Sequence, residues 1–412
     1  MKRPREGRIW KNRSLDTRDS SSWNGDDEDG GRNRDPIPLD LTLEILARLP
    51  VKSLTRFRSV SKLWASIIHG RDFINSFVVN PWNQPRLLFV FQYCKKWFIF
   101  SSPQNMNMEE ISSSRATFHM SCPEDRPWFP HSGSVYGLIC CGLPPSFVVL
   151  NPSTGQSIRL PKVKSRRLGI KKYLGYDPIV HQHKVLCMSV CLSNRWGESF
   201  VAGEFQVLTL GARKLSWRMI ECSVPHYPEK DHYCSEYDGI CINGVVYYQA
   251  RSQKYNGISM IMSFDVGSEK FSFIKPPEGI DFHLFHLILI NYKGKLAKIC
   301  CGSDIDLWVL EDAEKHEWSR KIHVPSPSWG YPIRKSIKYH IVTVNDEGEI
   351  VFAPRYLNHP LRVIYYNLER NTVRKVEIKG IAGDEFRLQD QDKSRRFNLT
   401  TLANHTESMM PL

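Results

Sequence analysis

The segment from Ile37 to Trp64 reads IPLDLTLEILARLPVKSLTRFRSVSKLW. Its apolar residues recur at helical rather than strand spacing, first at Leu41, Ile45, Leu46 and Leu49. Pro50 cannot continue a helix, so the first helix is predicted to end just before it. Ser53 and Ser61 favour helix starts and predict a second and a third helix. The segment is therefore predicted to be a small all-α unit.

The helical character extends to about residue 80, with Gly70 suited to a helix end. Residues 36–80 form the predicted helical domain. A unit of about 40 residues with this many large apolar side chains cannot bury all of them within itself. Some of them must face a partner or the next domain, which is the first indication of a docking module.

Residues 85–380 change to a period of two, with β-branched and aromatic residues punctuated by turn residues. Similar turn positions recur 46 to 59 residues apart, at Asn151, Leu210, Asp265, Glu311 and Asn367. Strands that recur near 50 residues without helices between them favour a kelch-like β-propeller of about six blades. A β-sandwich or two stacked sheets remains the alternative. The predicted fold class is α+β multidomain, with a small all-α domain followed by this all-β domain.

Both ends of the chain are predicted to be tails. Residues 1–35 carry few apolar side chains and are expected to be disordered. Residues 381–412 lose the strand pattern and are assigned to a C-terminal tail, although a strand near the C-terminus is considered as an alternative that closes the ring beside the first blade.

Composition restricts the class of protein further. The 412 residues contain no run near the roughly 18 apolar residues of a spanning helix, so no membrane association is expected. The N-terminus has no apolar signal region, which favours the nucleus and/or the cytoplasm, where the 11 cysteines should be reduced. The net charge of +13 is scattered along the chain and is interpreted mainly as a basic solvated surface.

The helical segment resembles an F-box. The family pattern of an Ile-Leu pair, Arg-Leu-Pro, Ser-Leu and Arg-x-Val-x-Lys-x-Trp matches the segment in order and spacing up to Trp64. Two departures are mild, because Ile37 replaces the usual opening Leu and Ser61 replaces a frequent Cys.

The β-region resembles the F-box-associated domain of a large plant family, of its third type. Six phrases in order carry this resemblance: RLLF from Arg86, NPSTG from Asn151, GYDP from Gly175, LTLG from Leu208, GICINGVVYY from Gly239 and FDV from Phe264. Each phrase alone is weak, and the ordered set is specific.

The two resemblances imply a substrate receptor of a Skp1–cullin–RING ubiquitin ligase, with no catalytic residue and no cofactor on this chain. They imply that the helical domain binds a Skp1-like adaptor, and through it cullin and RING subunits, while the β-domain binds a protein target. The apolar strip expected to bind the adaptor comprises Pro38, Leu41, Ile45, Leu46, Leu49, Pro50, Leu54, Phe57, Val60 and Trp64. Any one of these residues could instead point into the domain's own core.

Two other functions are considered. In the first, the basic β-domain binds RNA or another polyanion without delivering ubiquitin, although nucleic acid is not the favoured partner. In the second, the propeller is an enzyme, but no GxSxG, GxxxxGK[ST], HExxH or GxGxxG motif occurs. His183, Cys187 and Cys191 share one face of a predicted strand, and we interpret them as buried side chains rather than as metal ligands.

Overall fold

A computed structural model describes residues 37–105, 112–123, 133–165, 169–191, 201–228, 239–252, 258–277, 280, 288–301, 304–325, 339–381 and 397–412. The chain divides into two units, residues 1–42 and residues 43–412, which are described separately. The predicted N-terminal tail lies outside the described residues. No helix of the described part of the chain is long and apolar enough to cross a membrane.

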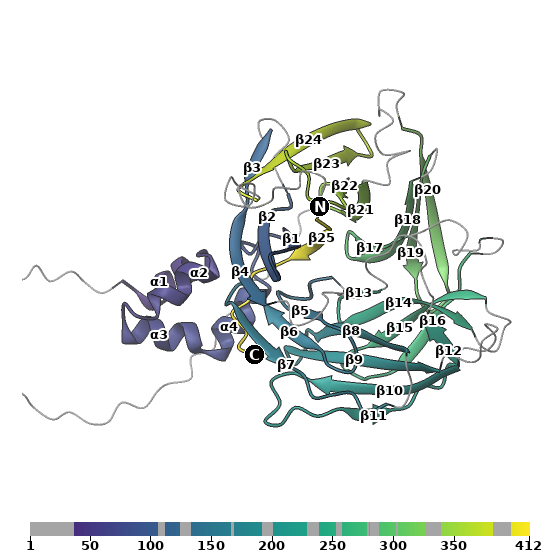
Figure 1. Cartoon of the computed structure of the whole chain (residues 1–412), viewed down its shortest axis with the longest axis horizontal. Coiled ribbons are helices and arrows are strands. Elements are labelled where there is room, and N and C mark those ends of the chain that lie inside the picture. Colours follow the sequence, from purple (N-terminus) through teal and green to yellow (C-terminus); the bar gives the residue numbers. More distant parts are fainter. Residues whose placement is uncertain are drawn as a thin grey trace, which may run out of the picture. The chain divides into compact units, whose positions relative to one another are not determined.

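Four helices open the described chain, three of them predicted from the sequence and the fourth formed by the last apolar stretch before residue 80 (Figure 1). The first unit contributes the start of α1 (Leu39–Ala47), and the second contributes its remainder together with α2 (Val51–Phe57), α3 (Lys62–His69) and α4 (Arg71–Val78). In the second unit these helices share one buried apolar core, formed by Leu46, Val51, Leu54, Ile68, Phe73 and Phe77. We call α1–α4 the helical module.

Two of the helix starts differ in how they are capped. Helix α3 begins as predicted, because the Ser61 side chain accepts a hydrogen bond of 3.2 Å from the amide of Leu63. The prediction that Ser53 caps α2 is wrong, since α2 already starts at Val51 and Pro50 offers no side-chain cap. The first amide of α2 is bonded from elsewhere in the chain, as described below.

The described strands form six sheets around a common axis. This arrangement is the six-bladed propeller that the sequence predicts (Figure 1). The first sheet has the order β25 (Leu399–His405), β1 (Arg86–Tyr93), β2 (Lys96–Pro103), β4 (Thr117–Pro123). The second contains β5 (Ile139–Cys141), β6 (Val148–Asn151) and β7 (Gln156–Arg159). The third contains β8 (Gly169–Asp177), β9 (Gln182–Cys191), β10 (Val201–Thr209) and β11 (Arg218–Ile220).

The other three sheets follow in chain order. The fourth contains β12 (His226–Pro228), β13 (Gly239–Ile242), β14 (Val245–Ser252), β15 (Ser259–Asp265) and β16 (Phe271–Ile274). The fifth contains β17 (Ile288–Tyr292), β18 (Lys295–Cys301), β19 (Ile305–Asp312) and β20 (Glu317–His323). The sixth contains β21 (Tyr339–Val344), β22 (Glu349–Pro354), β23 (Arg362–Asn367) and β24 (Thr372–Lys379), with β3 (Ser113–Arg115) added in parallel at its edge.

Each neighbouring pair of sheets shares one buried apolar cluster, so that six clusters join six sheets into a ring. Strand β1 shows why its sequence is a continuous apolar run. Leu87, Phe89 and Phe91 pack against the sixth sheet, whereas Leu88 and Val90 pack against the second. Successive side chains of a strand point to opposite faces, and both faces of β1 are buried.

The recurring turn residues of the sequence occupy the same place in five sheets. They lie at or next to the ends of β6, β10, β15, β19 and β23, where each strand turns into the last strand of its sheet. In two of them the asparagine closes the turn itself. The Oδ1 atom of Asn151 accepts from the amides of residues 153 and 154, and that of Asn367 accepts from residues 369 and 370.

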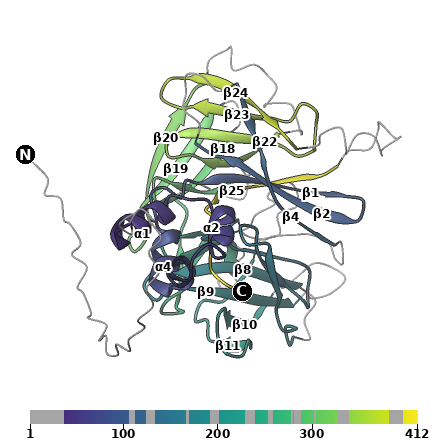
Figure 2. The ribbon, with the colours of Figure 1, turned by 90° about the vertical axis from the view of Figure 1, so that its left-hand side faces the viewer.

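The C-terminal region closes the ring. Strand β25 pairs antiparallel with β1, with Leu402 opposite Leu88 and Leu399 opposite Phe91 (Figure 2). Residues 399–405 were assigned to the C-terminal tail, and this assignment is corrected here; the alternative of a closing strand is confirmed. The partner of β25 lies at the other end of the domain, more than 300 residues away, so the local pattern does not reveal the pairing.

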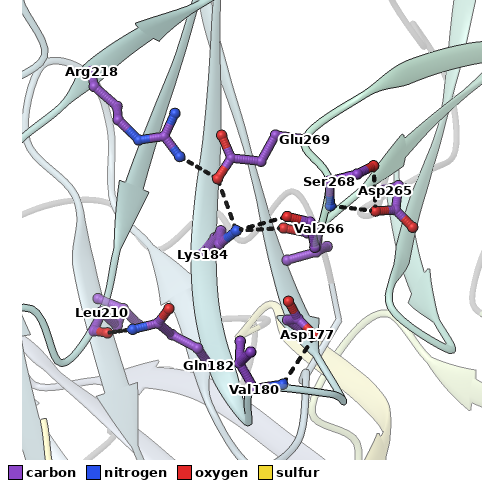
Figure 3. Close-up of polar contacts among 11 residues, drawn as sticks. Asp177, Val180, Gln182, Lys184, Leu210, Arg218, Asp265, Val266, Ser268 and Glu269 are labelled. Atoms are coloured by element: carbon purple, nitrogen blue, oxygen red, sulfur yellow. Dashed lines mark hydrogen bonds and ion pairs between the residues drawn. The ribbon is translucent and has the colours of Figure 1, made fainter.

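A charged cluster clamps the third sheet to the fourth (Figure 3). The Lys184 ammonium on β9 lies 2.8 Å from the Glu269 carboxylate and donates to the Val266 carbonyl at 2.7 Å. Arg218 on β11 pairs with the same carboxylate oxygen. Burial pushes the pKa of Glu269 upward, but the bonds from Arg218 and Lys184 outweigh it and hold the pKa below its ordinary value.

This depressed pKa predicts an acid-dependent loss of stability. The ionised Glu269 stabilises the fold above pH 4.5, its ordinary value, and the contribution is lost as the pH falls through the lower folded-state pKa. The free energy of unfolding of Glu269→Gln should therefore fall less steeply below pH 4.5 than that of the wild type. At pH 7 it should be slightly lower than that of the wild type. Urea unfolding at several pH values measures this. Glu314→Gln, at an exposed turn position, is the matched control, and parallel curves for wild type and Glu269→Gln would contradict the prediction.

Candidate functional site

The structure divides the ten residues of the predicted strip by their burial. Leu46 and Leu54 have no exposed surface and belong to the core of the helical module. They are therefore removed from the strip. For Leu46 the sequence pattern could not show this, because α1 is apolar around most of its circumference and spacing alone does not say which face is inside.

Three further residues of the strip are half-buried. Leu49, Phe57 and Trp64 pack against the same core, and the rings of Phe57 and Trp64 meet edge to face at 5.3 Å between centroids. These side chains support the module from within and leave part of their surface free.

The other five residues of the strip are exposed. Pro38 and Leu41 lie in the first unit, whereas Ile45, Pro50 and Val60 lie in the second. The Ile45 side chain is 46% exposed and that of Val60 is 66% exposed. These are large apolar groups left in water by a module whose core is already closed.

Sequence reasoning missed two exposed leucines of the same kind. Leu39 is in the first unit and Leu63 follows Ser61 in the second, and both are more than half exposed. Their spacing does not distinguish them from buried leucines, so the sequence held no signal for their exposure.

The exposed apolar side chains have no chemistry of their own, but they can bind a protein. Exposed apolar patches on soluble proteins mark interaction sites. Burying one such side chain contributes roughly 1.5–3 kcal/mol, so a few of them can dominate an interface.

One polar contact of the helical module could also not be predicted from the sequence. The Val51 amide, the first of α2, donates to Oε2 of Glu407 at 2.6 Å. A carboxylate at the N-terminus of a helix satisfies an unpaired amide and is favoured by the helix dipole. The two residues are 356 positions apart, so no local pattern could pair them.

At the axis of the propeller the inner strands line a cavity of about 230 Å³. Its lining includes Tyr136, Asn243, Asn291, Thr343 and Asn404, and none of the described residues that line it is charged. Apolar side chains such as Ile240, Leu289 and Val342 line the rest of it, and such a mixed lining suits neutral groups such as amides, hydroxyls and apolar side chains better than phosphates or metal ions.

Of the histidine and two cysteines considered as metal ligands, His183 and Cys187 are buried in the propeller. His183 is buried, its Nε2 donates to the Val135 carbonyl at 2.9 Å, and burial lowers its pKa to about 4. Burial raises the pKa of Cys187 to about 12, which keeps it a thiol. The Cys191 side chain lies outside the described residues. Within the described ranges, no three His, Cys, Asp or Glu side chains gather as a metal site.

Comparison with known protein families gives two matching domains along the chain. Residues 36–76 match the F-box domain, and residues 86–406 match the F-box associated beta propeller domain. The F-box protein DOR of Arabidopsis thaliana is 43% identical over 367 residues, covering 85% of this chain and 89% of that protein. The F-box protein At3g61340 of the same plant is 41% identical over 377 residues, covering 84% and 88%.

Proposed function

Because this chain belongs to the F-box proteins that carry an F-box associated beta propeller domain, we propose that it is the substrate-recognition subunit of a Skp1–cullin–F-box ubiquitin ligase. The helical module binds a Skp1-like adaptor, which connects it to the cullin and RING subunits. The propeller binds the target protein. The complex works in the nucleus or the cytoplasm.

In this proposal the chain contributes proximity rather than a reacting group. The amine of a target lysine attacks the ubiquitin thioester carried by the E2 enzyme, an isopeptide bond forms, and the E2 thiol leaves. Holding the target beside the thioester raises its effective concentration and restricts its orientation. The described residues that line the axial cavity carry no charge, which favours a protein target over RNA at that place.

One observation carries the proposal of adaptor binding. Large apolar side chains of the helical module stay exposed although Leu46 and its neighbours already form a closed core. In the second unit these are Ile45, Val60 and Leu63. Side chains that are needed for neither folding nor solubility are explained by a partner that covers them.

The proposal predicts that a charge on this surface abolishes adaptor binding without unfolding the module. The double variant Val60→Asp/Leu63→Asp should bind a co-expressed Skp1-like adaptor about 100-fold more weakly or worse, because two carboxylates would be buried without partners. Binding is measured by calorimetry on the full chain. The matched control is Ile179→Asp/Val180→Asp, which charges two exposed apolar residues of the β8–β9 turn.

The control variant should bind the adaptor as the wild type does. Equal affinity of all three proteins would overturn the assignment of this surface. A well-folded wild type that binds no Skp1-like adaptor would overturn the proposed function itself.

A further inference from the structure

The last seven described residues, 406–412, lie between the helical module and the second sheet of the propeller, and we call them the C-terminal segment. The part of the helical module concerned, residues 43–78, and the propeller both belong to the second unit. Glu407 and Met409 contact the helical module, whereas Ser408, Met410 and Leu412 contact the propeller. This alternation is what an extended chain gives when its two faces are covered by two different bodies.

On the helical side the contacts are both polar and apolar. Oε2 of Glu407 accepts the hydrogen bond of 2.6 Å from the Val51 amide, at the start of α2. Met409 packs against the core of the helical module. The segment therefore reaches the same core that contains Leu46 and Leu54.

The connection between α4 and β1 is bonded to the same segment. The Asn83 side chain donates to the Glu407 carbonyl at 2.7 Å and accepts from the Glu407 amide at 2.8 Å. A second side chain of this connection, Asn80, donates to the Ala47 carbonyl at 2.9 Å. The α4–β1 connection and the C-terminal segment, the two stretches of chain between the helical module and the propeller, are thus hydrogen-bonded to each other.

On the propeller side the segment is held by the turn that follows β6. The Asn151 side chain donates to the carbonyls of Ser408 and Met410, each at 3.0 Å. Ser408 is completely buried, and its amide donates to Oγ of Ser153 at 3.2 Å. Met410 and Leu412 pack on the cluster between the second and third sheets.

At Gly137 the C-terminal segment packs so closely against the propeller that a side chain would not fit. Gly137 has a φ of +83°, and a Cβ added there would overlap Cβ of Ser408 and lie 2.8 Å from the Thr406 carbonyl oxygen. The glycine is therefore needed both for its backbone conformation and for the passage of the segment.

We propose that the C-terminal segment is a splint that holds helices α2–α4 and the propeller in one fixed arrangement. The inference rests on the proposed function, in which the adaptor fixes one body and the target is held by the other. Glu407, Met409 and Asn151 are then positioning residues for ubiquitin transfer. They touch no reacting atom, but they set the distance between the target and the E2 enzyme.

The test measures the distance between the two bodies in the full chain. Spin labels are placed at the exposed positions 59 and 180 through a ketone-bearing unnatural amino acid, which leaves the native cysteines unmodified. In Glu407→Ala/Met409→Ala the distance distribution should broaden about twofold or more, because the segment then no longer holds the helical module. The matched control is Glu314→Ala/Met219→Ala, at two exposed positions outside the segment.

A second variant acts from the propeller side and leaves the helical module untouched. Gly137→Ala should displace the segment and broaden the distribution in the same way, even if loss of Met409 destabilises the helices. A distribution as narrow as that of the wild type in both variants would overturn the splint. Adaptor binding is measured separately, so a wild type that binds no adaptor contradicts the proposed function while the distance test still decides the splint.

Discussion

Leu46→Asp is expected to unfold the helical module rather than to weaken a surface contact. Leu46 has no exposed surface and lies among Val51, Leu54 and Ile68. Truncating such a leucine typically costs about 2–5 kcal/mol, and an unpaired buried carboxylate adds to that. A module of four short helices has little stability to lose. Hydrogen exchange of residues 39–78 should rise to the unprotected rate, and adaptor binding should be lost with it.

The neighbouring residue supplies the comparison. Ile45→Asp places the same charge one position earlier on α1, where the side chain is 46% exposed. In Ile45→Asp the amides of the helical module should stay protected from hydrogen exchange while adaptor binding falls. If Leu46→Asp kept wild-type protection, the burial of Leu46 in the module's core would be wrong, and Leu46 would return to the adaptor-binding surface.

Removal of residues 399–412 is expected to prevent the propeller from closing. Strand β25 covers the edge of β1, and its Leu402 lies in the cluster between the first and second sheets. Without β25 the backbone groups of β1 are exposed at an open edge, which favours aggregation. A milder change, Leu402→Asp, should lower the free energy of unfolding by at least about 3 kcal/mol, because the charge would be buried without a partner. Urea unfolding followed by tryptophan fluorescence measures it.

Truncation after His405 separates closure from the splint. This variant keeps β25 and loses only the C-terminal segment, so the propeller should stay folded while the distance distribution broadens. A chain ending at residue 398 that unfolds at the wild-type urea concentration would show that β25 does not hold the ring together.

Much of the architecture follows from local patterns. The change from helical spacing to a period of two marked the helices and the strands, because each element buries its own regular face. The capping of α3 by Ser61 and the turns at Asn151 and Asn367 need only the side chain and the next few amides. The recurrence of these turns near 50 residues, together with the length of the β-region, predicts about six blades, which the structure confirms.

Other features depend on residues far apart in the chain and were decided by the tertiary structure. Spacing identified Ile45 and Leu46 as apolar but could not place one in water and the other in the core. The cap on α2 comes from Glu407, and the partner of β1 is β25, more than 300 residues away. A side chain's period and its turn preference are properties of a few consecutive residues. Which distant surfaces meet depends instead on how the whole chain closes, and only the folded ring brings its two ends together.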